Sequence, residues 1–235
     1  MKRAIFQAVS ALLFIVFLRT SAPAQSIQQP NQHETLSTRY VECLRNAQGL
    51  PVASRAIKTP IFASADGSRA YGIVRAEHHS FSCENISRIY LANAHGPFRV
   101  LFRQGEEKLP NGMVYDGNGV EAIRWSPSGT RLLLEVSQWT WGTDSTWNTK
   151  YILFTKGHPE PQQLSPEETI WQQFPQPCQM TIESLGWTDD THVAFSVSPS
   201  REYDEEGTPL PTPPCVDKTK RFTFDVTTQR LHSAG

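Results

Sequence analysis

Short apolar runs alternate with turn-forming residues along most of the chain after residue 36. The runs are rich in Val, Ile, Leu and aromatic residues, and they end at Gly, Pro, Asp or Asn. Such runs are typical of β-strands, whereas no pattern with a helical period extends beyond two turns outside the N-terminal segment. We therefore predict an all-β protein with strands at 70–74, 88–92, 98–102, 132–136, 150–154, 162–164, 193–197, 221–226 and 230–232.

A strand–turn–strand motif occurs three times at constant spacing. Its copies begin at Ala63, Trp125 and Trp187, so the period is 62 residues both times. The copies read Ala-Ser-Ala-Asp-Gly-Ser-Arg, Trp-Ser-Pro-Ser-Gly-Thr-Arg and Trp-Thr-Asp-Asp-Thr-His, the last without the Gly. Equal spacing indicates equivalent supersecondary units. We predict three four-stranded antiparallel meanders, at about 60–121, 122–183 and 184–235.

The second copy, Trp-Ser-Pro-Ser-Gly-Thr-Arg-Leu-Leu-Leu from Trp125, resembles the Trp-Ser-Pro-Asp-Gly-x-x-Leu signature of TolB-type β-propeller repeats, which are distant relatives of WD repeats. The resemblance implies that each unit is a propeller blade. The units are longer than the usual blade of about 40–45 residues, and closed propellers have typically 4–8 blades. Residues 37–59 can add a strand or two. The alternatives are an open partial propeller, a ring completed by a homodimer, and another all-β fold that uses the same unit.

The N-terminus has the layout of a secretory signal. Lys2 and Arg3 precede an apolar stretch that ends near Leu18, and Ala22-Pro-Ala24 offers small residues for a signal peptidase. The stretch is shorter than the roughly 20 residues of a membrane-spanning helix. We predict a signal peptide at 1–24, a disordered polar lead-in at 25–36 and one β domain at 37–235, exported to the periplasm or secreted. An uncleaved anchor is the alternative; after cleavage no membrane span is expected.

The four cysteines are Cys43, Cys83, Cys178 and Cys215. An even number of cysteines in an exported chain favours disulfides over a metal site or a catalytic thiol. There is no closely spaced cysteine pair of the kind that binds zinc, and no metal or cofactor is expected. Four cysteines allow three pairings. We prefer Cys43–Cys83 and Cys178–Cys215, because both bridges would tie a long insertion to its own unit.

Composition narrows the class of protein. Hydrophobic residues make up 38% of the chain and aromatic residues 10%, which is too apolar for a disordered chain. The net charge is −1, from 22 Lys and Arg against 23 Asp and Glu. Without a basic excess, a nucleic-acid partner is not expected.

Three tryptophans lie close together in the second unit, at Trp139, Trp141 and Trp147. Trp139 and Trp141 alternate and would share one face of a strand. They could form an aromatic platform for a sugar ring or a peptide side chain. The alternative is packing within or between sheets, which we favour because aromatic side chains usually fill cores and interfaces.

Other polar groups give weaker signals. The segment Asp116–Glu121 has the start of a calcium loop but lacks its later ligands, so ordinary turns are favoured. His78 and His79 are adjacent and would point to opposite faces of a strand. The acidic and Pro-rich stretch 202–214 is either a solvated loop or a docking loop for a partner.

No catalytic motif with defined spacing occurs in the chain: Gly-x-Ser-x-Gly, His-Glu-x-x-His and Gly-rich phosphate loops are all absent. We therefore expect an exported binding or scaffold module whose loops contact a protein, peptide or glycan. The alternative is a secreted or periplasmic hydrolase or lyase whose catalytic residues are spread over several loops.

Overall fold

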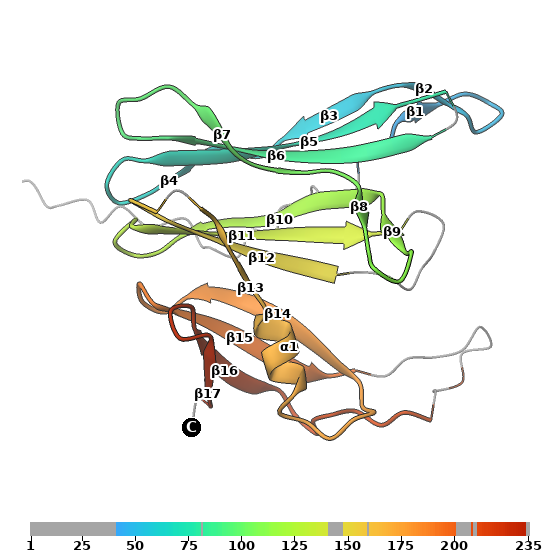
Figure 1. The fold of residues 1–235 in the computed structure, drawn as a ribbon. Helices are drawn as coiled ribbons and strands as arrows, with labels where there is room; N and C mark the ends of the chain where they lie inside the picture. The colour runs from blue at the N-terminus through green and yellow to red at the C-terminus, as the bar shows by residue number, and fades with distance from the viewer. Residues whose placement is uncertain are drawn as a thin grey trace, which may run out of the picture. The chain divides into compact units, whose positions relative to one another are not determined.

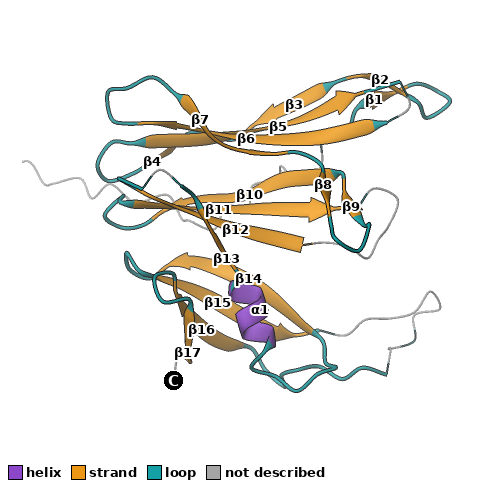
Figure 2. Ribbon diagram, viewed as in Figure 1, coloured by secondary structure: helices purple, strands orange, loops and turns teal. Residues whose placement is uncertain are grey.

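Antiparallel sheets follow one another along the chain in this computed structural model (Figure 1). The structure describes residues 41–80, 82–140, 148–158, 160–200, 208 and 211–233, which all belong to one compact unit, Gln32–Gly235. The signal segment expected at 1–24 and the lead-in expected at 25–36 lie outside these ranges. The described chain is all-β, as predicted. The short α1 (Pro166–Trp171) is its one described helix (Figure 2), and no described helix is long and apolar enough to cross a membrane.

Three large sheets are built from strands that are neighbours in the sequence. The first contains β3 (Arg55–Lys58), β4 (Phe62–Ala63), β5 (Arg69–His78), β6 (Cys83–Ala92) and β7 (Arg99–Gln104), in the order β3-β5-β6-β7 with β4 also paired to β5. The second contains β10 (Gly117–Trp125), β11 (Arg131–Trp139), β12 (Asn148–Thr155) and β13 (Gln162–Leu164). The third contains β14 (Met180–Trp187), β15 (His192–Pro199), β16 (Lys220–Asp225) and β17 (Arg230–Ser233).

Two small hairpins complete the strands. They pair β1 (Leu44–Arg45) with β2 (Pro51–Ala53), and β8 (Glu107–Lys108) with β9 (Val114–Tyr115). Strands β10 and β14 begin at Gly117 and Met180, a few residues before the unit boundaries that the repeat suggested. The segment before residue 60 supplies β1, β2 and β3, of which β3 joins the first sheet.

The repeated motif forms the hairpin turn that precedes β5, β11 or β15. In the first two copies a glycine has a positive φ, +80° at Gly67 and +72° at Gly129, which only Gly adopts without strain. Each glycine N–H donates to the Ser carbonyl three residues earlier. In the third copy the Asp189 carboxylate accepts the backbone N–H groups of Thr191 and His192 instead, at 2.7 and 2.9 Å. A side chain therefore replaces the glycine in closing the third turn.

The second sheet contributes to two hydrophobic cores. Alternate residues of a strand point to opposite faces. Accordingly, Leu132 and Leu134 of β11 belong to a core shared with the first sheet, whereas Leu133 belongs to a core shared with the third. Nearly every residue of β11 is buried. The second sheet is therefore packed on both faces, which explains why β11 contains the unbroken apolar run Leu132–Leu134 instead of a strict alternation.

A tryptophan of the repeat makes the same hydrogen bond at both sheet junctions. The indole N–H of Trp125 donates to the carbonyl of Phe62 at 3.1 Å, from the second sheet to the first. The indole N–H of Trp187 donates to the carbonyl of Arg124 at 3.0 Å, from the third sheet to the second. Donor and acceptor both shift by one period of the repeat. The first copy has Ala63 at this position and no donor.

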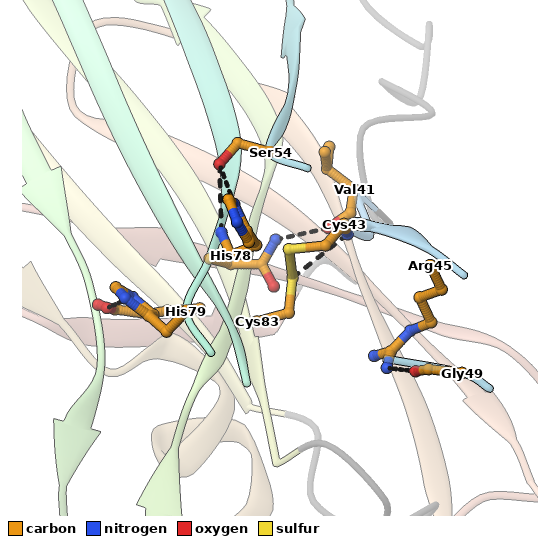
Figure 3. Close-up of a disulfide and its surroundings, with 10 residues drawn as sticks. Val41, Cys43, Arg45, Gly49, Ser54, His78, His79 and Cys83 are labelled. Carbon is orange, nitrogen blue, oxygen red and sulfur yellow. Dashed lines mark hydrogen bonds and ion pairs between the residues drawn. A yellow bond between two sulfur atoms is a disulfide. The ribbon is translucent and has the colours of Figure 1, made fainter. Parts of the chain in front are cut away.

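Two disulfides join Cys43 to Cys83 and Cys178 to Cys215, the pairing that we preferred from the sequence. Figure 3 shows the first bridge, beside which the Asn85 side chain donates to the carbonyl of Val41 at 2.8 Å. This disulfide ties the segment before β1 to the start of β6. The second bridge ties the segment just before β14 to the segment before β16, and Gln179 and Pro214 of the same two segments also pair.

Strand β6 begins at Cys83, five residues before the predicted strand. Three of the five missed residues, Glu84, Asn85 and Ser87, are polar, and polarity in the sequence favours a connection over a strand. Asn85 and Ser87 are nevertheless completely buried. The Ser87 hydroxyl donates to the side-chain oxygen of Asn118 at 2.6 Å. The side-chain amide of Asn118 donates to the backbone carbonyl of Asn85, also at 2.6 Å. These bonds pair the Ser87 hydroxyl, the Asn118 side chain and the Asn85 amide nitrogen, while the Asn85 side-chain oxygen has no partner among the described residues. Most of the buried polar atoms are thus satisfied, which allows a polar strand in the interior.

The repeated indole bond can be tested by removing its donor. We expect Trp187→Phe to lower the free energy of unfolding by about 1 kcal/mol, because the Arg124 carbonyl loses a hydrogen bond while most of the ring is retained. Trp125→Phe should cost a similar amount at the other junction. Urea denaturation measures both. If both variants are as stable as the unmodified chain, the bonds do not hold the sheets together.

Candidate functional site

A cleft of about 240 Å³ lies between the β12–β13 hairpin of the second sheet and the turn after β16 in the third. Its apolar part is formed by Leu153 and Val226. Its polar part is formed by Arg131, Thr155, His158, Glu160, Gln162 and Thr227. The cleft thus offers hydrogen-bonding groups around a small apolar patch, and its lining is more polar than that of a typical small-molecule site.

The strand register explains why these side chains meet. Arg131 is paired with Thr155 across β11 and β12, so both point to the same face as Leu153. Arg131 donates to the carbonyl of Asp190 at 3.1 Å and to the Thr227 hydroxyl at 3.2 Å. The guanidinium therefore fixes the edge of the third sheet against the second. This leaves His158, Glu160 and Gln162, all exposed, as the side chains best placed to contact a ligand.

A second contact reinforces this end of the sheets. The Asp190 carboxylate accepts the backbone N–H of Ser128 at 2.8 Å, and hydrogen bonding from Ser128 keeps the pKa of Asp190 below its usual value. At the preceding junction, Lys156 forms an ion pair with Asp66. Asp66 and Asp190 hold the same place in the first and third copies of the repeat. Neighbouring turns are thus linked by polar contacts at both junctions.

A buried polar cluster lies deeper on the same face of the second sheet. Arg124 forms an ion pair with Glu135, and their side chains are 13% and 9% exposed. Arg124 also donates to the Ser184 hydroxyl of the third sheet at 3.0 Å. Burial raises the pKa of Glu135, against the lowering effect of Arg124 and Ser184. The residues that line the cleft do not include this group, so its contacts join sheets rather than face a ligand.

Tyr151 and Glu167 extend the cluster towards α1. The Tyr151 hydroxyl donates to the Glu167 carboxylate at 2.7 Å. Burial raises the pKa of Tyr151 well above its usual value, and the charges of Glu167 and Glu135 raise it further. Burial also raises the pKa of Glu167, while the bond from Tyr151 lowers it. The phenol therefore stays protonated and serves as a donor at neutral pH.

The structure places one of the three platform tryptophans. Trp139 is 2% exposed, and its ring lies where a side chain at Gly117 would be, on the paired strand β10. A ring buried in this way packs the sheet and offers no face to a ligand. Trp141 and Trp147 lie outside the described residues.

The structure also describes most of the other polar residues that the sequence analysis considered. Most of the segment 116–121 lies in β10 rather than in turns, and Asn118 is buried there, so our expectation of turns was wrong. His78 is within hydrogen-bonding distance of Ser54, and His79 is 3.6 Å from Glu84 (Figure 3). Residues 202–207 lie outside the described ranges.

The cleft has no signature in the sequence. Its exposed side chains, at His158, Glu160 and Gln162, come from a polar segment with two prolines that begins between the strands predicted at 150–154 and 162–164. Polar residues and prolines are the ordinary content of a link between strands. A cleft depends on how two sheets meet, and the local sequence carries no signal of that.

The packing of Trp139 predicts a severe effect of Gly117→Ala. The added methyl group would overlap the buried indole ring, so we expect a loss of about 1–3 kcal/mol in the free energy of unfolding. Gly96→Ala is the matched control. Its Cβ would have no neighbour closer than 3.8 Å, and we expect a change within about 0.5 kcal/mol. Equal losses in the two variants would contradict the packing.

The buried ion pair predicts a pH-dependent defect in Arg124→Met. Without the guanidinium, Glu135 is left buried and unpaired, and we expect a loss of about 3 kcal/mol at pH 7. Its pKa then lies higher in the folded chain than in the unfolded chain, so stability falls as the pH rises and part of it returns near pH 5. The double variant Arg124→Met/Glu135→Gln should lack this pH dependence. Urea denaturation between pH 5 and 8 provides the measurement, and a defect independent of pH in the single variant would refute it.

Comparison with known proteins adds one distant likeness. No family model matches the chain, and no curated protein matches it. Among solved structures, the apo form of the AtxE2 isopeptidase is similar over 74% of this chain, with a TM-score of 0.41 and 13% sequence identity. The chain covers 28% of the length of that protein. A likeness of this size establishes neither a family nor a function.

Proposed function

We propose that this protein is an exported binding or scaffold module that holds part of a protein, peptide or glycan in the cleft between its second and third sheets. The cleft carries the proposal, because it presents exposed polar side chains on a rigid support. His158 and Glu160 lie on the short β12–β13 connection, Gln162 begins β13, and Arg131 holds the opposite wall in place. Binding residues are often carried by loops on a rigid scaffold.

The size of the cleft favours one small group of a larger ligand. Its volume of about 240 Å³ lies below the roughly 300–1,000 Å³ of typical small-molecule sites. One sugar ring or one polar side chain is of suitable size, with Leu153 and Val226 against its apolar surface. Glu160 and Gln162 offer acceptors for hydroxyl or amide groups, and His158 offers a donor or an acceptor.

Export and a propeller-like arrangement are part of the same proposal. Two disulfides fit an oxidising compartment, and the N-terminal residues have the composition of a secretory signal. The indole bonds recur with the period of the TolB-type motif, as equivalent contacts between successive blades would. On this interpretation the cleft opens between two blades.

The proposal is tested by screening the purified chain on glycan and peptide arrays and then measuring the affinity of a hit for variants. We expect His158→Ala and Glu160→Gln each to weaken binding by about tenfold, the effect of losing one good hydrogen bond. His95→Ala is the matched control, because exposed His95 occupies the corresponding connection of the first sheet, between β6 and β7. It should bind as the unmodified chain does.

Three results would count against this function: no ligand on either array, equal loss in all three variants, or turnover of array substrates. Turnover that survives in His158→Ala and Glu160→Gln would favour a hydrolase or lyase with its catalytic residues elsewhere.

A further inference from the structure

Two histidines and an aspartate converge on the outer face of the third sheet, the face opposite the core residues Val193 and Phe195. Register places His192 of β15 directly opposite Asp225 of β16. His232 of β17 lies opposite Thr223, and so is the diagonal neighbour of Asp225 on the same face. One ligand atom of each of the three residues lies within 4.8 Å of the other two.

We propose that His192, Asp225 and His232 bind a divalent transition-metal ion, with Zn²⁺ as the reference ion. Two imidazoles and one carboxylate form a donor set that suits zinc and its neighbours, whereas Ca²⁺ and Mg²⁺ prefer oxygen ligands. None of the three residues lines the cleft, although the cleft residue Thr227 donates its backbone N–H to Asp225. The proposal does not depend on the proposed function.

The spacing of the ligand atoms is close to that of a formed site. Zinc lies about 2.0–2.1 Å from its ligands, so two atoms that bind one tetrahedral ion are about 3.4 Å apart. Each pair of ligand atoms therefore has to approach by at most about 1.5 Å. His232 is exposed and can rotate, and its ring centroid is 6.0 Å from that of His192.

The orientation of His192 is the strongest support for a metal site. Its Nδ1 lies 3.0 and 2.9 Å from the two carboxylate oxygens of Asp189. An Nδ1–H that donates to this carboxylate leaves the lone pair on Nε2 available for a metal. Metal-binding histidines commonly donate their other N–H to a carboxylate in this way, which fixes the ring and makes it a better ligand.

Asp189 is itself held in place by hydrogen bonds. Its Oδ1 accepts the backbone N–H of Thr191 at 2.7 Å and the Thr191 hydroxyl at 2.8 Å. It also accepts the backbone N–H of His192 at 2.9 Å. The same carboxylate closes the β14–β15 turn, so the turn that replaces glycine in the third copy of the repeat also orients His192.

Asp225 is fixed by a different turn. One carboxylate oxygen, Oδ1, accepts the backbone N–H groups of Thr227 and Thr228 at 2.7 and 3.1 Å. The other oxygen can then face the imidazoles. Two of the three ligands are thus oriented by neighbouring turns, and three protein ligands leave a fourth position of a tetrahedral ion for water or an exogenous group.

Zinc titration of the purified chain, with no polyhistidine tag and after treatment with a chelator, tests the proposal. All four cysteines are in disulfides, so no thiolate competes for the metal. We expect one zinc ion per chain by calorimetry. His232→Ala and Asp225→Asn should each weaken binding by at least about tenfold, and Asp189→Asn by about tenfold through the orientation of His192. His79→Ala and His95→Ala are controls that should bind zinc unchanged, because both histidines are exposed and lie in the first sheet or its connections.

Two further readouts separate loss of the site from loss of the fold. Each variant is checked by circular dichroism, and Co²⁺ replaces Zn²⁺ so that visible absorption reports the coordination of the ion. A folded His232→Ala chain should lose the Co²⁺ bands of the unmodified chain. The proposal is overturned if the unmodified chain binds no zinc, if the control histidines matter as much as His232, or if the Co²⁺ spectrum survives in His232→Ala.

Discussion

The indole hydrogen bond between neighbouring sheets is the contact on which the rest of the structure depends. A sheet with one apolar face must bury it against another element, but apolar packing alone does not fix the relative position of two sheets. Trp125 and Trp187 supply both requirements, because each ring packs in or against a core while its N–H reaches a carbonyl of the preceding sheet. The bond is directional and therefore favours one position of each sheet against the preceding sheet.

Once the sheets are positioned in this way, polar contacts can form between their turns. Asp190 meets Ser128, Arg131 reaches both Asp190 and Thr227, and the cleft lies beside these contacts. Deeper on the same face, Arg124 and Glu135 are buried together with Ser184. A buried ion pair contributes little net stability, but it is costly to break and so disfavours other arrangements of the sheets.

One face of the third sheet is apolar and packs in the core, and the other face is polar. Val193, Phe195 and Phe224 fill the core, while the alternate positions carry His192, Thr223 and Asp225. Because successive side chains of a strand point to opposite faces, polar residues on the outer face do not disturb the packing of the core. Cross-strand pairing can therefore bring the side chains of His192, Asp225 and His232 together on this face, although they come from three different strands.

Local sequence determined the features that depend on neighbouring residues: the β class, the central part of most strands, the repeated turn and the sheet order. The preference for the Cys43–Cys83 and Cys178–Cys215 bridges came from their places in the repeat. Tertiary structure decided the rest. Asn85 and Ser87 can lie in a buried strand because the Asn85 amide donates to the carbonyl of Val41 and the Ser87 hydroxyl donates to the side chain of Asn118. Trp139 is buried because Gly117 leaves room for its ring. The cleft and the His192, Asp225 and His232 cluster require residues that are distant in sequence to meet across strands or sheets. Periodicity indicates the face on which a side chain lies, but only the register of the paired strands brings it to its partner.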